Sequence, residues 1–202
     1  MLYTSVKDTV DKLDVNQVSE VRKEILQPLI EFIKDKKENN ERILLNFICT
    51  HNSRRSHLAQ IWAQVMAEYY HINNVDSYSG GTEATAMFPK VVETLIHQGL
   101  QINKASETIN PIYYINLGDN IKPVIGFSKI FEDDYNPKSN FAAIMTCSSA
   151  DEGCPFVFGC SKRIAVTYED PKAFDGTDLQ TEKYLERSVQ IATEMKYVFK
   201  SV

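Results

Sequence analysis

The chain has 202 residues, of which 43% are hydrophobic and 24% are charged, a balance typical of one soluble domain of moderate size. Its net charge of −5 provides no general attraction to nucleic acid or to an anionic membrane surface, so any bound anion must be held by local groups. With no apolar stretch of roughly 20 residues and a charged N-terminus unlike a signal peptide, the sequence predicts a cytoplasmic protein, with neither nucleic acid nor membrane as partner.

Residues 1–41 are expected to form a helical N-terminal extension. Apolar residues recur at helical spacing between residues 15 and 37. A polar connector, KDKKENNER, then leads into the main domain, residues 42–202. We see no catalytic chemistry in the extension.

In the main domain, strands and helices are expected to alternate. Strands are predicted at residues 43–48, 75–81, 141–149 and 162–171, and helices at 56–70, 89–100 and 180–199. The first strand is almost entirely apolar, as in a central parallel strand covered on both faces. This order predicts an α/β fold with a parallel sheet. An insertion at about 108–140 has two β-rich runs around Gly-Asp-Asn, which predicts a hairpin that covers the site or forms an interface.

The segment CTHNSRRS, residues 49 to 56, has the features of an oxyanion-binding loop. Catalytic residues of open α/β sheets gather at the carboxyl ends of the strands, where Cys49 lies. A helix that begins near Arg55 points its free N–H groups and its positive end into the loop. The backbone amides can then form a nest for a tetrahedral oxyanion, with Asn52 suited to a left-handed turn. The oxyanion-binding residues expected are Thr50, His51, Asn52, Ser53, Arg54, Arg55 and Ser56.

The same loop should activate the thiol of Cys49. Arg55 can bind two oxygens of the anion in bidentate fashion, and Ser56 can donate a hydrogen bond to the sulfur. A helix N-terminus beside an arginine favours the thiolate form, which makes Cys49 a nucleophile directed at the central atom of the anion. By the same strand-end argument, Cys147 and Asp170 should lie at this edge of the sheet.

With these features, the sequence resembles the low-molecular-weight protein tyrosine phosphatase superfamily, which includes the thioredoxin-coupled arsenate reductases. The resemblance rests on the Cys-x5-Arg-Ser loop, on YSGGTEATAMFPKVVETLIHQGL, and on the Asp-Pro of EDP at 169–171. It covers about residues 42–200 apart from the insertion. It implies a three-layer sandwich with a four-stranded parallel sheet flanked by helices, and Asp170 as the general acid.

The segment TCSSADEGCP resembles the redox segment of the arsenate reductase branch. The resemblance implies that Cys49 attacks arsenate, that Cys147 resolves the adduct as a disulfide, and that Cys154 carries the disulfide outward to thioredoxin. Ordinary phosphatases lack this pair of cysteines. They also often carry tyrosines after the Asp-Pro, where this chain has KAFDG.

Two other functions also fit this sequence. The chain could be a phosphatase that hydrolyses phosphotyrosine or small phosphoesters through a cysteinyl-phosphate, or a non-catalytic oxyanion-binding module. Arg54 departs from the small residue or cysteine common at its position, and its side chain either adds charge to the site or points to solvent. Cys160 is expected to be incidental. A zinc site built from Cys147, Cys154 and Cys160 is disfavoured because the spacing is unusual and no histidine is close, so we predict neither metal nor cofactor.

Overall fold

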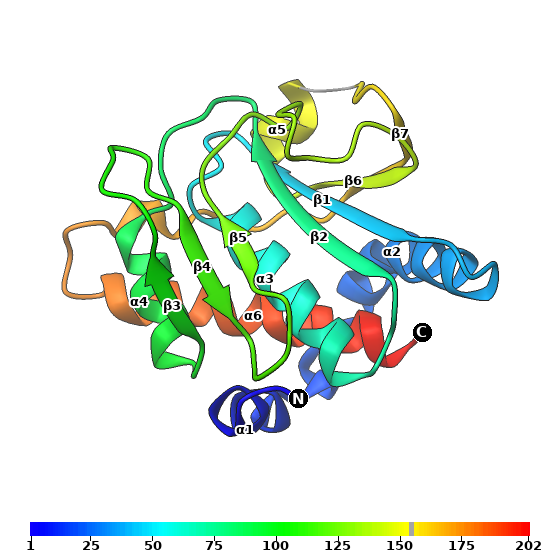
Figure 1. The fold of residues 1–202 in the computed structure, drawn as a ribbon, viewed down its shortest axis with the longest axis horizontal. Helices are drawn as coiled ribbons and strands as arrows, with labels where there is room; N and C mark the ends of the chain where they lie inside the picture. The colour runs from blue at the N-terminus through cyan, green and yellow to red at the C-terminus, as the bar shows by residue number, and fades with distance from the viewer. Residues whose placement is uncertain (154–155) are drawn as a thin grey trace.

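The computed structural model describes residues 1–153 and 156–202. Its central sheet has four parallel strands in the order β2-β1-β6-β7 (Figure 1). These strands are β1 (Ile43–Cys49), β2 (Val75–Gly81), β6 (Phe141–Met145) and β7 (Cys160–Ala165). The helices of the main domain are α3 (Arg55–Tyr69), α4 (Pro89–His97), α5 (Ser148–Gly153) and α6 (Gln180–Lys200). The predicted α/β class, with a four-stranded parallel sheet flanked by helices, is confirmed.

Two of the predicted strands end earlier than expected. The third ends at Met145, because α5 begins at Ser148 and turns the chain away from the sheet. The fourth ends at Ala165. Beyond it, the backbone N–H groups of Val166 and Tyr168 donate to the carbonyls of Met145, the last residue of β6, and Thr146. Asp170 therefore lies in a loop rather than at the last position of a strand.

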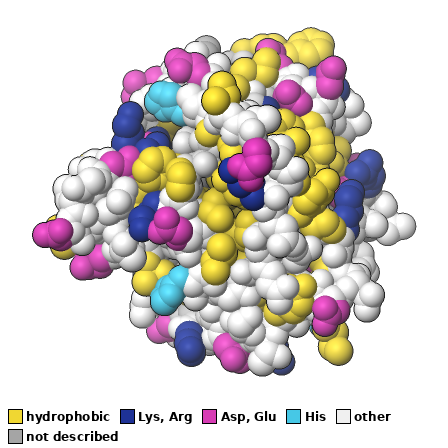
Figure 2. All heavy atoms as spheres, turned by 60° about the vertical axis from the view of Figure 1, so that its left-hand side comes forward, with side chains coloured by type: hydrophobic (Ala, Val, Ile, Leu, Met, Phe, Trp, Pro, Cys, Tyr) yellow, Lys and Arg dark blue, Asp and Glu magenta, His cyan; other side chains and the backbone are white. Residues whose placement is uncertain are grey.

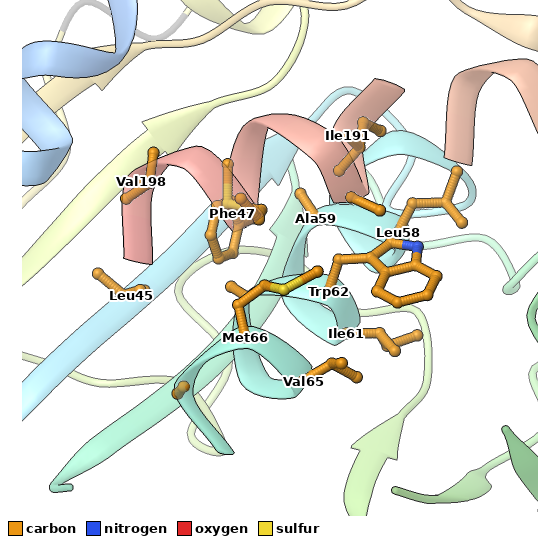
Figure 3. Close-up of a cluster of buried hydrophobic side chains, with 14 of the residues drawn as sticks. Leu45, Phe47, Leu58, Ala59, Ile61, Trp62, Val65, Met66, Ile191 and Val198 are labelled. Carbon is orange, nitrogen blue, oxygen red and sulfur yellow. The ribbon is translucent and has the colours of Figure 1, made fainter. Parts of the chain in front are cut away.

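The larger hydrophobic core lies between one face of the sheet and helices α3 and α6. Side chains of Leu45 and Phe47 on β1 meet those of Trp62 and Met66 on α3 and Ile191 on α6 (Figure 3). The only polar atom of the Trp62 side chain, its indole nitrogen, donates to the Ser188 hydroxyl at 2.9 Å. Burial of this apolar surface is the main force that holds α3, and with it the loop before it, against the sheet.

The N-terminal helices belong to this same core. They are α1 (Thr4–Lys12) and α2 (Glu20–Glu38), joined through the short 3₁₀ helix η1 (Val15–Gln17). Val6 and Val10 of α1 and Leu26 and Ile33 of α2 are fully buried within it. Residues 1–41 are thus packed tightly on the main domain.

The opposite face of the sheet carries a smaller hydrophobic cluster. It contains Ile48, Phe141 and Met145 together with two cysteines, Cys49 and Cys147. The short helix α5 contacts β1 and β6 on this side. The two thiols of interest therefore share one buried environment.

The insertion and the residues just before it form a separate antiparallel sheet. It consists of β3 (Gln101–Lys104), β4 (Tyr113–Asn116) and β5 (Val124–Gly126), in that order. The pairing of β4 with β5 confirms the predicted hairpin, whereas β3 was not predicted. This sheet lies to one side of the parallel sheet (Figure 1).

Candidate functional site

Cys49 is the last residue of β1 and its side chain is almost fully buried. Its sulfur lies 3.1 Å from the hydroxyl oxygen of Ser56. The side-chain amide of Asn52 donates to that same oxygen at 2.9 Å. Because the oxygen already accepts a hydrogen bond from Asn52, its own hydrogen can point to the sulfur of Cys49.

The loop after Cys49 has the backbone of an anion nest. Asn52 adopts the left-handed conformation, with φ of 42°, as its sequence position predicted. Helix α3 begins at Arg55, so the free N–H groups of its first turn face the loop. None of the backbone N–H groups from Thr50 to Ser56 donates a hydrogen bond to any other described residue. These donors are suited to the oxygens of a tetrahedral anion.

The insertion holds this loop in place. The Ser128 hydroxyl donates to the carbonyl of His51 at 3.1 Å, and the backbone N–H of Lys129 donates to the Asn52 side chain at 2.9 Å. The segment after β5 therefore fixes two successive loop residues. Neither contact was predictable, because the sequence gives no sign that residues 128 and 129 return to the loop.

Arg55 and Asp170 are brought together. The Nη2 of Arg55 lies 2.6 Å from a carboxylate oxygen of Asp170, and its Nη1 donates to the Tyr168 carbonyl at 2.9 Å. Its Nε is buried and has no partner among the described residues. The other carboxylate oxygen of Asp170 accepts from the backbone N–H of Lys172. The predicted anion clamp and the predicted acid are thus direct neighbours.

The side chain of Arg54 is buried and does not point into solvent. Its Nε donates to the Tyr184 hydroxyl at 2.6 Å and its Nη2 to Asp175 at 2.6 Å. Its guanidinium carbon lies 4.2 Å from the centre of the Phe88 ring. The alternative in which this side chain points to solvent is therefore wrong, and its positive charge near the site is paired with Asp175.

Asp175 is the charged partner of Arg54. Burial raises the pKa of its carboxyl, but hydrogen bonds from Tyr184, Gln180 and Arg54 outweigh that effect and hold the pKa below its ordinary value. Asp175 follows the 3₁₀ helix η2 (Pro171–Phe174), which Asp170 caps. Arg55 and Arg54, which are adjacent in the sequence, thus bind the segment 170–175 at two points, Asp170 and Asp175.

Cys147 lies next to the loop that follows Cys49. The register of β1 and β6 pairs Ile48 with Met145, so both cysteines emerge at the same edge of the sheet. The Thr50 hydroxyl oxygen lies 3.5 Å from the Cys147 sulfur. Cys147 is buried, and the backbone N–H of Ala150 donates to its sulfur at 3.3 Å.

The two remaining cysteines differ in position. Cys154, the predicted outer relay thiol, lies outside the described residues. Cys160 pairs with Phe141 at the amino end of β6, the opposite end from Cys147. Burial raises the pKa of the Cys160 thiol. This position explains why Cys160 does not join the thiols at the carboxyl edge.

The face of the molecule drawn in Figure 2 does not carry charges of a single sign. Figure 2 brings forward the left-hand side of Figure 1, and it shows basic and acidic side chains interspersed with apolar ones. Anion selectivity must then come from the loop itself rather than from the overall charge. Within the described part of the chain, no helix combines the length and hydrophobicity needed to cross a membrane.

Comparison of the sequence with known proteins identifies arsenate reductases as relatives. Arsenate reductase 2 of Staphylococcus haemolyticus is 24% identical over 135 residues, which cover 66% of this chain and 82% of that protein. An arsenate reductase of Staphylococcus aureus (strain Newman) is 26% identical over 135 residues, with the same shares. No protein-family model matches the chain.

Solved structures share the fold. An arsenate reductase in the phosphate-binding state has a TM-score of 0.50 at 17% identity, covering 79% of this chain and 98% of that one. A YwlE mutant from Bacillus subtilis has a TM-score of 0.50 at 15% identity, covering 78% and 97%. A low-molecular-weight phosphotyrosine phosphatase from Vibrio cholerae O395 has 0.50 at 13%, covering 77% and 93%. The predicted resemblance to this superfamily, with arsenate reductases among the similar sequences, is confirmed.

Proposed function

We propose that this protein is an arsenate reductase that uses the Cys49 thiolate as its nucleophile and thiol–disulfide exchange to complete the reduction. The observation that carries the proposal is the position of Cys147. Its sulfur lies beside Thr50, the first residue of the oxyanion loop, and in the same buried cluster as Cys49. Hydrolysis of a phosphoester has no use for a second thiol at this place. Reduction of arsenic needs one.

In the first step the loop amides and Arg55 bind arsenate, and the Cys49 thiolate attacks arsenic. An arsenic–oxygen bond breaks, and protonated Asp170 supplies the proton that lets the oxygen leave as water. Arg55 must exchange its Asp170 partner for the anion, because its Nη2 contacts that carboxylate directly. Anion binding and release of Asp170 are therefore linked in this proposal.

In the second step the Cys147 thiolate attacks the sulfur of Cys49. A sulfur–sulfur bond forms and the sulfur–arsenic bond breaks, with its electron pair going to arsenic. Arsenic(V) becomes arsenic(III) and leaves as arsenite, while two thiols are oxidised to one disulfide. Cys154 then attacks Cys147 and frees Cys49, and a dithiol reductant such as thioredoxin reduces the Cys147–Cys154 disulfide. The reducing cytoplasm would supply such a reductant.

The second candidate is a phosphatase. Cys49, Arg55 and Asp170 would suffice for a cysteinyl-phosphate intermediate resolved by water, and the same fold occurs in a phosphotyrosine phosphatase. One experiment separates the two candidates. Arsenite release is measured with thioredoxin, thioredoxin reductase and NADPH, beside hydrolysis of p-nitrophenyl phosphate. Many turnovers of arsenate support the reductase, whereas hydrolysis without arsenate turnover would assign the phosphatase.

A further inference from the structure

Arg22, on helix α2, connects the N-terminal helices to the segment that carries Asp170. Its Nε and Nη2 donate to the two carboxylate oxygens of Glu194 on α6, at 2.9 and 2.6 Å. Its Nη1 donates to the backbone carbonyl of Thr167 at 3.2 Å. One planar guanidinium thus joins α2, α6 and the backbone just before Asp170.

Tyr168 provides a second link to the same pair. Its hydroxyl donates to Glu194 at 2.8 Å, and the Arg22 guanidinium carbon lies 5.0 Å from the centre of its ring. Burial, together with the Glu194 carboxylate, raises the pKa of the Tyr168 hydroxyl well above its ordinary value, so it keeps its proton and remains a donor. The three side chains hold one another in a single arrangement.

The backbone of Tyr168 faces the candidate site. Its carbonyl accepts from the Nη1 of Arg55 at 2.9 Å, and the Nη2 of Arg55 contacts Asp170. A continuous series of contacts therefore runs from Arg22 through Tyr168 to Arg55 and Asp170. The other edge of this segment is held by backbone bonds from Val166 and Tyr168 to the end of β6.

From these contacts we propose that Arg22 is a positioning residue for Asp170 and Arg55. The inference rests on the function proposed above and adds a role for the N-terminal helices in it. Arg22 does not touch the substrate. It holds the segment 166–170 through the Thr167 carbonyl, on the side opposite the backbone hydrogen bonds to Met145 and Thr146. Displacement of a reacting group by about 1 Å can lower a rate on the order of 10²-fold.

The test uses two variants of the full chain and one control. Arg22→Lys keeps a positive charge beside Glu194 but lacks the planar set of donors needed for both Glu194 and Thr167. The double variant Arg22→Met with Glu194→Gln removes both charges, so it leaves no unpaired buried charge. It serves as the second test in case Arg22→Lys folds poorly. Lys196→Met is the control, because Lys196 joins α6 to the carbonyls of Val10 and Leu13 without contacting the segment 166–170.

Two readouts are compared with wild type. The first is amide hydrogen exchange of a peptide covering residues 166–170, which should be faster in both Arg22 variants and unchanged in the control. The second is kcat for phenyl phosphate and p-nitrophenyl phosphate. Phenyl phosphate needs the general acid more, because its leaving group is the poorer one. We expect its kcat to fall about 10- to 100-fold in the Arg22 variants, with a smaller loss for p-nitrophenyl phosphate.

The outcomes separate the positioning role of Arg22 from the proposed function. Unchanged exchange in both Arg22 variants, or an equal loss of kcat for the two esters, would overturn the positioning role. Faster exchange with the larger loss on phenyl phosphate would support it. A wild type inactive on arsenate and on both esters would contradict the proposed function, while the exchange comparison would still decide whether Arg22 holds the segment.

Discussion

Arg55 and Asp170 form an ion pair, with the Nη2 of Arg55 lying 2.6 Å from a carboxylate oxygen of Asp170. The arginine expected to clamp the anion is therefore joined to the group expected to protonate the leaving oxygen. An oxyanion in the loop and the Asp170 carboxylate require the same donor. Removal of the carboxylate should then affect binding and turnover in opposite directions.

Asp170→Asn should bind inorganic phosphate more tightly and turn over more slowly. The neutral amide no longer competes with the anion for the charge of Arg55. A partly exposed ion pair contributes up to about 1 kcal/mol, so Kd for phosphate should fall by up to roughly fivefold. Loss of the acid should slow the first chemical step by roughly 10²- to 10⁴-fold. Calorimetric titration with phosphate and single-turnover kinetics measure the two effects. Weaker phosphate binding by the variant would contradict the competition.

Arg55→Lys should lose most activity although it keeps the charge. Lysine is a point donor and cannot contact two oxygens of the anion in one plane. Steady-state kinetics with arsenate and with p-nitrophenyl phosphate should both show the loss. Near-normal kinetics would mean that Arg55 is not the clamp, and Arg54 could replace it only after leaving Tyr184 and Asp175.

Asp175→Asn should lower stability at neutral pH by on the order of 2 kcal/mol, because Arg54 and Tyr184 lose a charged acceptor. The pKa of Asp175 is held below its ordinary value of 3.8 in the folded state. Its stabilising effect is therefore present above that value and is lost as the pH falls through the lower, folded value. Urea unfolding at pH 7 and at pH 3 should show a smaller difference between variant and wild type at pH 3. A constant difference would argue against the charged contact.

Gly81→Ala should distort the oxyanion loop. An added Cβ would lie 2.5 Å from the carbonyl oxygen of Glu83 and 2.6 Å from backbone atoms of Thr50 and Asn52. Backbone atoms cannot move aside as the end of a flexible side chain can. We therefore expect the free energy of unfolding to fall by about 1–3 kcal/mol and phosphate to bind more weakly. Gly153→Ala is the matched control, since its Cβ would meet nothing within 4 Å. Equal melting temperatures and phosphate affinities for the two variants would contradict this.

Cys147→Ser should stop catalytic release of arsenite and leave hydrolysis of p-nitrophenyl phosphate nearly intact. Hydrolysis needs only Cys49, Arg55 and Asp170, whereas reduction needs the second thiol. Cys49→Ser should abolish both activities, because a serine hydroxyl stays protonated at neutral pH. Sustained reduction of arsenate by Cys147→Ser would remove the main support for the reductase proposal.

Cys154→Ser should release about one equivalent of arsenite, as the proposed stoichiometry requires, and then stall with a Cys49–Cys147 disulfide. Cys147 is 1% exposed, so a reductant in solution cannot reach that disulfide without movement of the segment that covers it. Peptide mapping under non-reducing conditions should find a Cys147–Cys154 disulfide in oxidised wild type. Many turnovers by Cys154→Ser would show that the outer thiol is dispensable.

Much of the fold and the centre of the site could be predicted because they depend on local patterns. The apolar run of β1 specifies a buried central strand, and the break after Cys49 specifies where it ends. Asn52 adopts the left-handed conformation and α3 begins at Arg55, as the loop sequence indicated. The hairpin of the insertion was likewise visible as two β-rich runs around a turn.

The sequence by itself determined the parallel sheet and the conformation of the loop between β1 and α3, because strand periodicity and turn preferences act over a few neighbouring residues. Only the tertiary structure decided the partners of the charged side chains. Arg54 turns to Tyr184 and Asp175 because those groups satisfy a guanidinium that burial has taken out of water. The contact of Arg22 with Glu194 joins residues 172 positions apart, and no local pattern encodes a pairing over that distance.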